Sequence, residues 1–269
     1  MEKINKLRNL LKKEKIDGYI IPKNDHFFGE YIPDYFDRLN YISNFTGSFG
    51  FALILKNKNY LFVDGRYTLQ AANQSGKFFK IITFPEKMPY DLFKNKNLLI
   101  GYDPKLLTRK TLDIFFKRGK CEFIQIKNNL IDKVWKRKIN SRKNKFYVMP
   151  KHSIGEEYKS KVKKVVAYLK KRNADLQFTT ASENNAWLLN IRGNDTKYTP
   201  IPNSYTLVDK NENIIFFCDL NKISKNLKKK YSKVKFIDIN SVEKIISKIR
   251  EKNFIIDENT CSSFFENLI

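Results

Sequence analysis

The sequence predicts an α/β protein with two similar domains, each a mixed β-sheet flanked by helices. One plan is written twice: the apolar strands Phe51–Leu55 and Tyr60–Val63 form a hairpin before a helix, and Ser204–Lys225 follows the same order. Asp64 and Asp219 stand at the same point of the two copies, 155 residues apart (219 minus 64). A period of this length indicates two related domains, because solenoid repeats are much shorter.

Matching segments flank both hairpins. Upstream, residues 41–48 (YISNFTGS) correspond to residues 187–194 (WLLNIRGN), and downstream Asn97–Asp103 corresponds to Asn253–Asp257. Apolar strands alternate with helical patterns around both hairpins, which is typical of α/β layers. Because a hairpin is antiparallel, its presence predicts that each sheet is mixed.

The elements of the first half follow from local patterns. Glu2–Lys15 has apolar residues at helical spacing, and Ile16–Ile21 is an apolar run that Pro22 ends. Thr108 is a side-chain cap for the helix that follows it. Beyond the hairpin we expect a helix over Arg66–Gln74, strands over Phe79–Thr83, Leu98–Tyr102 and Glu122–Ile126, and a helix over Thr108–Phe116.

The second half begins after a basic stretch, VWKRKINSRKNKFYVMP, that lacks aliphatic periodicity. We therefore place a first domain over residues 1–135, a linker over 136–153 and a second domain over 154–269. In the second domain we expect helices over Tyr158–Arg172, Glu183–Leu189, Ile223–Tyr231 and Ser241–Glu251, and strands over Asp175–Thr179, Val234–Ile237 and Phe254–Ile256.

Composition predicts a folded protein of the cytoplasm. Hydrophobic residues make up 42% of the 269 residues and aromatic residues 14%, which excludes a disordered chain. There is no run of about 18 apolar residues, so no membrane span is predicted. The sequence after Met1 has no apolar signal-peptide core. Three scattered cysteines, Cys121, Cys218 and Cys261, indicate buried thiols in a reducing compartment rather than disulfides.

The formal net charge of +24 has two interpretations. Lysines that neutralise phosphates would make the chain a non-specific nucleic-acid binder. Alternatively, the lysines form a solvated surface on the polar faces of helices such as Tyr158–Arg172. They are spread along the whole chain without a recognised DNA- or RNA-binding motif, so the second interpretation is favoured and a nucleic-acid partner is not expected.

A series of motifs occurs in a fixed order in the first half: Asp25-His26, Glu30-Tyr31, Arg38, Asn44–Gly50 and Asp64–Tyr67. This series resembles the amino-terminal domain of aminopeptidase P, the Xaa-Pro aminopeptidases of the creatinase and methionine aminopeptidase superfamily. Residues 186–195 (AWLLNIRGND) and Ile255–Asp257 are similar to the second domain of the three-domain members. The resemblance covers nearly the whole chain, and its strength is that several motifs occur in the same order.

The resemblance implies two creatinase N-terminal-like domains. Members of this family remove an amino-terminal residue that precedes proline, with two divalent metal ions, usually manganese, held in a third domain of pita-bread fold. The matched motifs end with the second domain, and the sequence stops at Ile269. We therefore expect no catalytic residue, metal site or cofactor in these residues, and we expect the catalytic domain to be missing or separate.

Other chemistries are not supported by the residues. His26 and His152 are the only histidines, and neither lies in a metal-binding pattern. Nucleophile-elbow and phosphate-loop motifs are absent from the sequence. The glycines of Gly47–Gly50 precede a strand instead of a helix, so they do not predict phosphate binding.

The candidate functional residues lie in two loops, each of which contains an arginine. Asp64, Arg66 and Tyr67 form the first group, and Arg192 and Asp195 form the second. One interpretation is that each arginine pairs with the nearby carboxylate and stabilises its loop. The other, which the resemblance implies, is that these residues face the catalytic domain and shape the substrate entrance. Trp187 is expected in the core.

The sequence thus predicts the N-terminal, non-catalytic portion of an Xaa-Pro aminopeptidase, inactive by itself. Its expected contributions are domain packing, dimerisation as a homodimer and shaping of the entrance for a peptide substrate, which would bind only with the catalytic domain. The alternatives are a free-standing peptide-binding or scaffold module, and a weak nucleic-acid binder whose affinity would fall steeply with salt.

Overall fold

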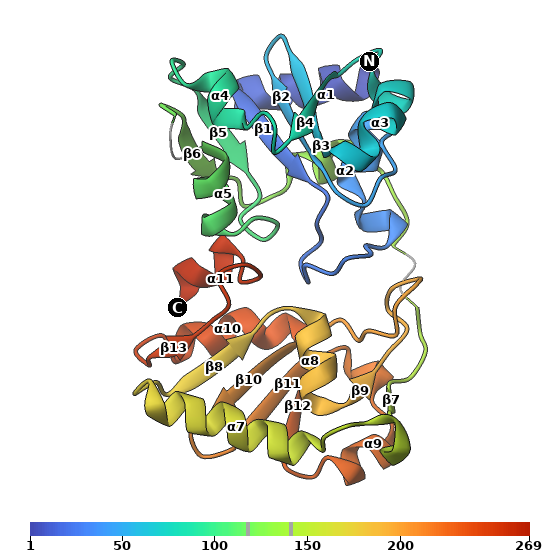
Figure 1. Cartoon of the computed structure of the whole chain (residues 1–269), viewed down its shortest axis with the longest axis vertical. Coiled ribbons are helices and arrows are strands. Elements are labelled where there is room, and N and C mark those ends of the chain that lie inside the picture. The colour runs from blue at the N-terminus through green and yellow to red at the C-terminus, as the bar shows by residue number, and fades with distance from the viewer. Residues whose placement is uncertain (117–118, 140–141) are drawn as a thin grey trace. The chain divides into compact units, whose positions relative to one another are not determined.

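The computed structural model describes residues 1–116, 119–139 and 142–269 (Figure 1). These residues divide into two compact units. Unit 1 comprises Met1–Asp25 and Asp34–Ile139, and unit 2 comprises His26–Pro33 and Asn140–Ile269. Each unit has its own sheet, and each sheet has apolar side chains packed against both of its faces.

Unit 1 contains a mixed sheet with the order β4-β3-β2-β1-β5-β6. The pairs β1–β2 and β2–β3 are antiparallel, while β3–β4, β1–β5 and β5–β6 are parallel. The strands are β1 (Gly18–Pro22), β2 (Phe51–Leu55), β3 (Asn59–Asp64), β4 (Lys80–Phe84), β5 (Leu99–Tyr102) and β6 (Glu122–Gln125).

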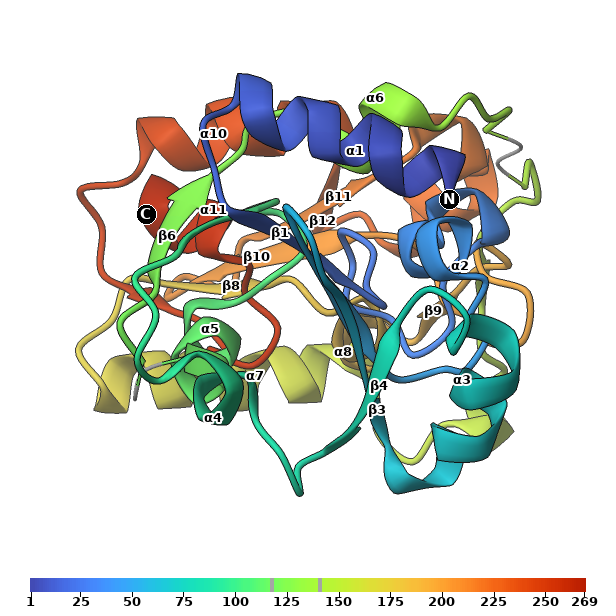
Figure 2. The same cartoon turned by 90° about the horizontal axis from the view of Figure 1, so that it is seen from above.

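Helices cover both faces of this sheet. One face carries α1 (Glu2–Lys13), α2 (Arg38–Ser43), α3 (Thr68–Ser75) and α6 (Leu130–Val134), and the other carries α4 (Pro89–Phe93) and α5 (Arg109–Phe116). Figure 2 shows α1 and α6 on one side of the strands and α4 and α5 on the other. Two 3₁₀ turns, Asp34–Phe36 and Gly65–Tyr67, complete the unit. Thr108 accepts a hydrogen bond from the Thr111 amide at the start of α5, so the predicted cap is present.

Unit 2 contains a mixed sheet with the order β12-β11-β10-β8-β13. Its strands are β8 (Leu176–Thr179), β10 (Tyr205–Asp209), β11 (Ile214–Cys218), β12 (Val234–Asp238) and β13 (Phe254–Ile255). A separate pair of short strands, β7 (Tyr147–Val148) and β9 (Ile191–Arg192), lies antiparallel. The stretch expected as a linker therefore includes a strand of unit 2.

The helices of unit 2 also form two layers. One face packs against α7 (Tyr158–Lys171), α8 (Ser182–Leu189) and α9 (Lys225–Lys230), and the other packs against α10 (Val242–Lys248) and α11 (Ser263–Leu268). Short 3₁₀ turns lie at Lys151–Ser153, Leu220–Lys222 and Ile239–Ser241. Phe27, from the His26–Pro33 segment of this unit, stacks on Tyr205 with ring centroids 5.3 Å apart.

The two sheets have the same topology, which confirms the predicted pair of similar α/β domains. Strands β4-β3-β2-β1-β5 correspond in order and direction to β12-β11-β10-β8-β13. Helices α2 and α8 also correspond, because each ends on an asparagine in the left-handed conformation, Asn44 with φ 64° and Asn190 with φ 57°. Strand β6 has no counterpart among the described residues of unit 2.

No helix in the described part of the chain is both long and apolar enough to cross a membrane.

Candidate functional site

The first candidate loop is a capped turn on the surface of unit 1. Asp64 accepts a hydrogen bond from the Arg66 amide (2.9 Å), which begins the 3₁₀ turn Gly65–Tyr67. The Arg66 guanidinium donates to the same carboxylate, with 2.6 Å between Nη2 and Oδ2. These bonds lower the pKa of Asp64 below its usual value. The Arg66 side chain is 75% exposed, so the pair is a solvated one that organises the turn.

Tyr67 joins this turn to the glycine-bearing loop before β2. Its hydroxyl lies 2.7 Å from the Ser48 hydroxyl, and its ring packs edge-on against Phe45. A Cβ atom on Gly47 would lie 2.2 Å from the Phe45 ring, so no larger residue fits there without a shift. The sequence motif around Gly47 is therefore explained by close packing between loop and turn.

The second candidate loop has different partners from those expected. Arg192 donates to two backbone carbonyl oxygens, Ala186 O at 2.6 Å and Ile191 O at 3.1 Å. Asp195 pairs with the ammonium group of Lys222 and accepts the Asn203 amide at 2.7 Å. The expected ion pair between Arg192 and Asp195 is wrong, because the Asp195 carboxylate pairs with Lys222 instead.

The pair formed by Asp195 and Lys222 is buried inside unit 2. The side chains are 4% and 8% exposed, respectively, and the Lys222 ammonium lies 5.9 Å from the centre of the Phe146 ring. Gly193 contacts the same ring, since a Cβ atom there would lie 2.9 Å from it. Asp219 caps the Leu220–Lys222 turn just as Asp64 caps its own turn. The Leu220–Lys222 turn of unit 2 is thus the equivalent of the Gly65–Tyr67 turn of unit 1.

Trp187 lies at the surface, and its expected place in the core is wrong. The residue is 57% exposed, and the Lys161 ammonium lies 4.3 Å from the centre of its ring. It lines a pocket of about 310 Å³, which we call the Trp187 pocket. The walls are formed by α7, α8, β8 and β13, and they include Val165, Asn184, Trp187, Leu188, Ile255 and Ile256.

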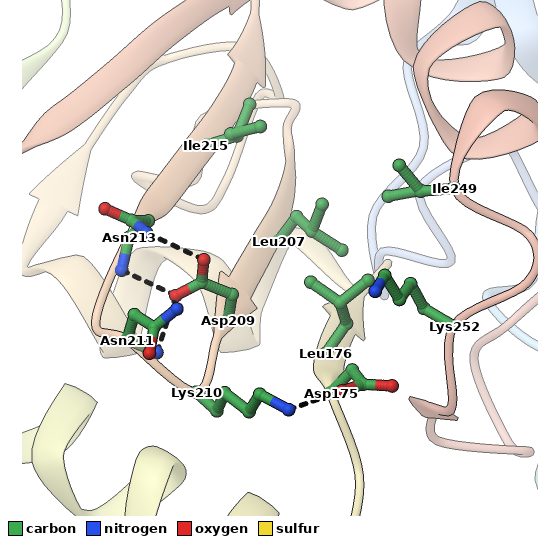
Figure 3. A pocket seen from close by; sticks show the side chains of 10 residues that line it. All are labelled: Asp175, Leu176, Leu207, Asp209, Lys210, Asn211, Asn213, Ile215, Ile249 and Lys252. Atoms are coloured by element: carbon green, nitrogen blue, oxygen red, sulfur yellow. Dashed lines mark hydrogen bonds and ion pairs between the residues drawn. The ribbon is translucent and has the colours of Figure 1, made fainter.

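A second pocket of unit 2, of about 370 Å³, lies beside the turn between β10 and β11 (Figure 3). Its apolar side chains are Leu176, Leu207, Ile215 and Ile249. Figure 3 shows the Lys210 side chain directed toward Asp175, and the two form an ion pair of 2.8 Å. Asp209 accepts bonds from the backbone and side chain of Asn213, which stabilise the turn.

The charges of this pocket belong to the repeated fold. Asp175 also accepts the Asn253 amide at 3.1 Å, and its hydrogen bond from Lys210 lowers the pKa of its carboxyl. In unit 1 the equivalent Asp17 pairs with Lys56 and accepts the Leu99 amide at 2.9 Å. Because both units have the same aspartate, with an ion pair to a lysine and a hydrogen bond from a backbone amide, this ion pair indicates a structural role rather than a ligand site.

Metal-binding and thiol chemistry have little support among the described residues. Within residues 1–116, 119–139 and 142–269, no group of three or more His, Cys, Asp or Glu side chains could hold a metal ion. These residues therefore do not fit a two-metal centre. The predicted burial is confirmed for Cys218 and Cys261, whose thiol pKa values burial raises, while Cys121 is half-buried.

Two family models, both describing the creatinase/prolidase N-terminal domain, match the chain. One covers residues 3–134 and the other residues 137–269, so the two matches lie in tandem and correspond to the two sheets. The chain belongs to the creatinase/prolidase N-terminal domain family. The resemblance to aminopeptidase P is confirmed by the relatives found with it.

Those relatives are Xaa-Pro aminopeptidases that are longer than this chain. A probable Xaa-Pro aminopeptidase P from Laccaria bicolor is 34% identical over 226 residues, which cover 80% of this chain and 35% of the relative. Xaa-Pro aminopeptidase 1 from Dictyostelium discoideum is 32% identical over 248 residues, covering 84% and 39%. The chain thus spans little more than a third of the length of these relatives.

A solved structure agrees over the full length of the chain. The X-prolyl aminopeptidase from Caenorhabditis elegans, described as a cytosolic enzyme with a di-nuclear active site, matches with a TM-score of 0.89 and 26% identity. The match covers 100% of this chain and 48% of the nematode protein. Both units of the fold are therefore found together in a solved aminopeptidase.

Sequence reasoning identified the loops but missed the pocket. Asp64, Arg66 and Tyr67 do lie together, whereas Arg192 and Asp195 have separate partners. The Trp187 pocket was missed because Trp187 lies in an apolar stretch, WLL, that is typical of a buried helix face. A signal was present in the repeat, since Asn184 occupies the position that is Arg38 in the first copy.

Proposed function

We propose that residues 1–269 are the non-catalytic N-terminal portion of an Xaa-Pro aminopeptidase and act together with a metal-binding catalytic domain elsewhere in the longer protein. The observation that carries the proposal is the tandem match to two creatinase/prolidase N-terminal domain models. The relatives that share this match are longer, and the chain spans about 35% of their length. In this role the chain supplies two rigid α/β units, with cytosolic action as in the nematode relative.

The substrate entrance is the proposed place of action for the Asp64–Tyr67 turn. Its exposed guanidinium is held by a carboxylate at a defined position, which suits recognition of a peptide carboxylate or of a facing domain. Arg192 is bound to two backbone carbonyls and Asp195 is buried, so these two residues support the loop in unit 2. We also propose that two copies pair in the complete enzyme.

The activity of the isolated chain provides the first test. Purified residues 1–269 with Mn²⁺ should release no amino-terminal residue from a Xaa-Pro peptide, because the proposed chemistry requires two metal ions in another domain. Release above the rate of a metal-only blank would contradict the proposal. The matched positive control is a complete Xaa-Pro aminopeptidase under the same conditions.

The source of the catalytic domain provides the second test. Coding DNA after residue 269 should encode a domain with two Asp, one His and two Glu ligands, either in the same reading frame or as a separate chain. In a protein that contains both parts, Arg66→Ala should lower kcat/KM for Xaa-Pro peptides, while Lys96→Ala, another exposed position of unit 1, should not. Equal kcat/KM values for the two variants would contradict the proposed role of Arg66 at the substrate entrance.

Self-association is tested by light scattering. A dimer of the complete enzyme that persists on dilution supports the proposed pairing of two copies, and a monomer at high concentration contradicts it.

A further inference from the structure

The repeat gives unit 1 a filled groove and leaves the equivalent groove of unit 2 unfilled. In unit 1 the segment that follows β5 adds strand β6 at the edge of the sheet and then forms α6 against α1 and α2. In unit 2 the corresponding edge is β13, and no described strand lies beyond it (Figure 1). The Trp187 pocket lies beside this edge, and Ile255 of β13 is one of its walls.

In unit 1, side chains of α2 bind α6 directly. The Arg38 guanidinium donates to both carboxylate oxygens of Asp132 at 2.8 Å, in a bidentate ion pair. Tyr41 stacks on Trp135 with ring centroids 4.7 Å apart and donates its hydroxyl to the Val134 carbonyl at 3.1 Å. Thus α2 presents one charged and one aromatic side chain that recognise a short helix.

Two aliphatic residues of α6 fill the space between these helices. Leu130 and Ile131 are fully buried and share a core cluster with Leu7 of α1, which is also fully buried. Lys133 adds an ion pair with Glu14 at the end of α1. The groove of unit 1 is therefore a binding site for an edge strand followed by a short amphipathic helix, already occupied by its own chain.

The equivalent positions of unit 2 line the Trp187 pocket. Counting back from the left-handed asparagines that end both helices, Asn184 takes the place of Arg38 and Trp187 takes that of Tyr41. Counting back from the aspartates that precede the central strands, Val165 takes the place of Leu7. All three line the pocket, and Trp187 is more than half exposed.

We propose that the Trp187 pocket and the β13 edge together bind a polypeptide segment of the β6–α6 type. The segment adds a parallel strand to β13, places two adjacent aliphatic side chains in the pocket and covers Trp187 with an apolar residue. Strand addition at an unpaired edge supplies backbone hydrogen bonds, and the pocket supplies side-chain selectivity. Asn184 is uncharged, so the segment offers an amide or hydroxyl where α6 has Asp132.

The source of the segment is the additional polypeptide that the longer relatives carry outside the matched part. Only this choice of source rests on the proposed function, because the groove itself is inferred from the repeat. An exposed apolar pocket next to an open strand edge is an aggregation hazard unless it is covered, which favours a segment of the same protein over a transient partner.

The chain provides a probe and a reporter for the test. The probe is a synthetic peptide of residues 122–135 (EFIQIKNNLIDKVW) in which phenylalanine replaces the tryptophan. In the Trp135→Phe protein, Trp187 is the only tryptophan, so its emission reports on this pocket alone. Peptide binding should shift the emission of Trp187 to shorter wavelength and saturate.

Control variants separate this pocket from unspecific contact. A peptide with aspartate at the positions of Leu130 and Ile131 should bind at least about tenfold more weakly, because the two buried aliphatic side chains are replaced by charged ones that the pocket does not pair. Val165→Lys in the protein should abolish the shift, whereas Leu69→Lys, at a residue of unit 1 that is 74% exposed, should not. Unchanged Trp187 emission at millimolar peptide would overturn the proposal.

The source is tested in the longer protein. There Trp187 should emit as a buried tryptophan without added peptide, a readout that does not depend on peptide hydrolysis. Exposed-type emission from Trp187 in that protein would overturn the assigned source. A dimer of residues 1–269 that Val165→Lys dissociates would do so as well, since a second copy would then be the occupant.

Discussion

Units 1 and 2 share a topology, but side chains at equivalent positions differ in their burial and in their partners. Each has a capped turn after the hairpin, an ion pair before the central strand and a helix that ends on a left-handed asparagine. Unit 1 buries the groove beside that helix with β6 and α6 and leaves its arginine turn exposed. In unit 2 no described strand lies beyond β13, Trp187 is exposed, and the last residue of the turn, Lys222, is buried.

The comparison shows that a repeated fold preserves backbone geometry more strictly than the burial of side chains. The turn needs only an aspartate to cap it, so the residues that follow differ between the units. Arg66 and its counterpart Asn221 are both exposed, whereas Lys222 is buried and its counterpart Tyr67 is half-buried. Likewise the helix needs its C-cap and its inner face, while its outer positions change from Arg38 to Asn184. Positions that serve the backbone are thus common to both units, and positions that serve a neighbour differ.

The largest expected effect compares the buried ion pair of unit 2 with the exposed ion pair of unit 1. Lys222→Ala should destabilise unit 2 by about 3–5 kcal/mol, because it leaves the Asp195 carboxylate buried without its cation. Arg66→Ala should change the stability of unit 1 by less than about 0.5 kcal/mol, because its pair is solvated. Urea unfolding followed by hydrogen exchange of peptides from each unit measures both values. Similar losses in the two variants would contradict the difference in burial.

The next effect concerns the two equivalent helix positions. Arg38→Ala should cost unit 1 about 3 kcal/mol, since it removes two charge-assisted hydrogen bonds to the partly buried Asp132. Asn184→Ala should cost unit 2 less than about 0.5 kcal/mol, because this residue is exposed. The same exchange measurement should show the peptides of α6 losing protection first in Arg38→Ala. Unchanged protection of α6 would show that α2 does not hold it.

A smaller effect is expected in a pH titration, which tests the ion pair between Arg38 and Asp132. Burial alone would raise the pKa of Asp132, but hydrogen bonds from Arg38 and Arg137 outweigh it, so the pKa is lowered. A carboxyl with a lowered folded pKa contributes stability above its unfolded pKa of about 3.9, and this is lost as the pH falls through the folded value. The stability difference between wild type and Asp132→Asn should therefore shrink below about pH 4. A difference that is constant down to pH 2 would contradict this assignment.

The smallest effect is on thiol reactivity. Cys121 precedes β6 and is half-buried, whereas Cys218 and Cys261 are fully buried in unit 2. Burial raises the pKa of all three thiols, to about 12 for Cys261. A thiol probe at pH 8 should modify Cys121 first, and the Cys121→Ser variant should react only on unfolding. Labelling of Cys261 at a rate equal to that of Cys121 would show that unit 2 opens more readily than its packing indicates.

Most of the strands and long helices were predictable because their signals are local. The hairpins, which make each sheet mixed, and the cap at Thr108 follow from patterns within a few residues of one another. Helix α6 was not predicted, because five residues are too few to show a helical period, and this helix depends on contacts with α1 and α2. Strand β7 was not predicted either, because its partner strand β9 is distant in sequence.

By itself, the sequence determined the duplicated α/β plan, its capped turns and its membership of the creatinase/prolidase N-terminal family. Only the tertiary structure decided which charges pair and which aromatic residue is exposed. The physical reason is that a cap or hairpin depends on neighbouring residues, whereas a partner such as Lys222 for Asp195 is chosen by distance and burial in space. The same holds for Trp187, whose exposure depends on the absence of a neighbouring helix among the described residues of unit 2.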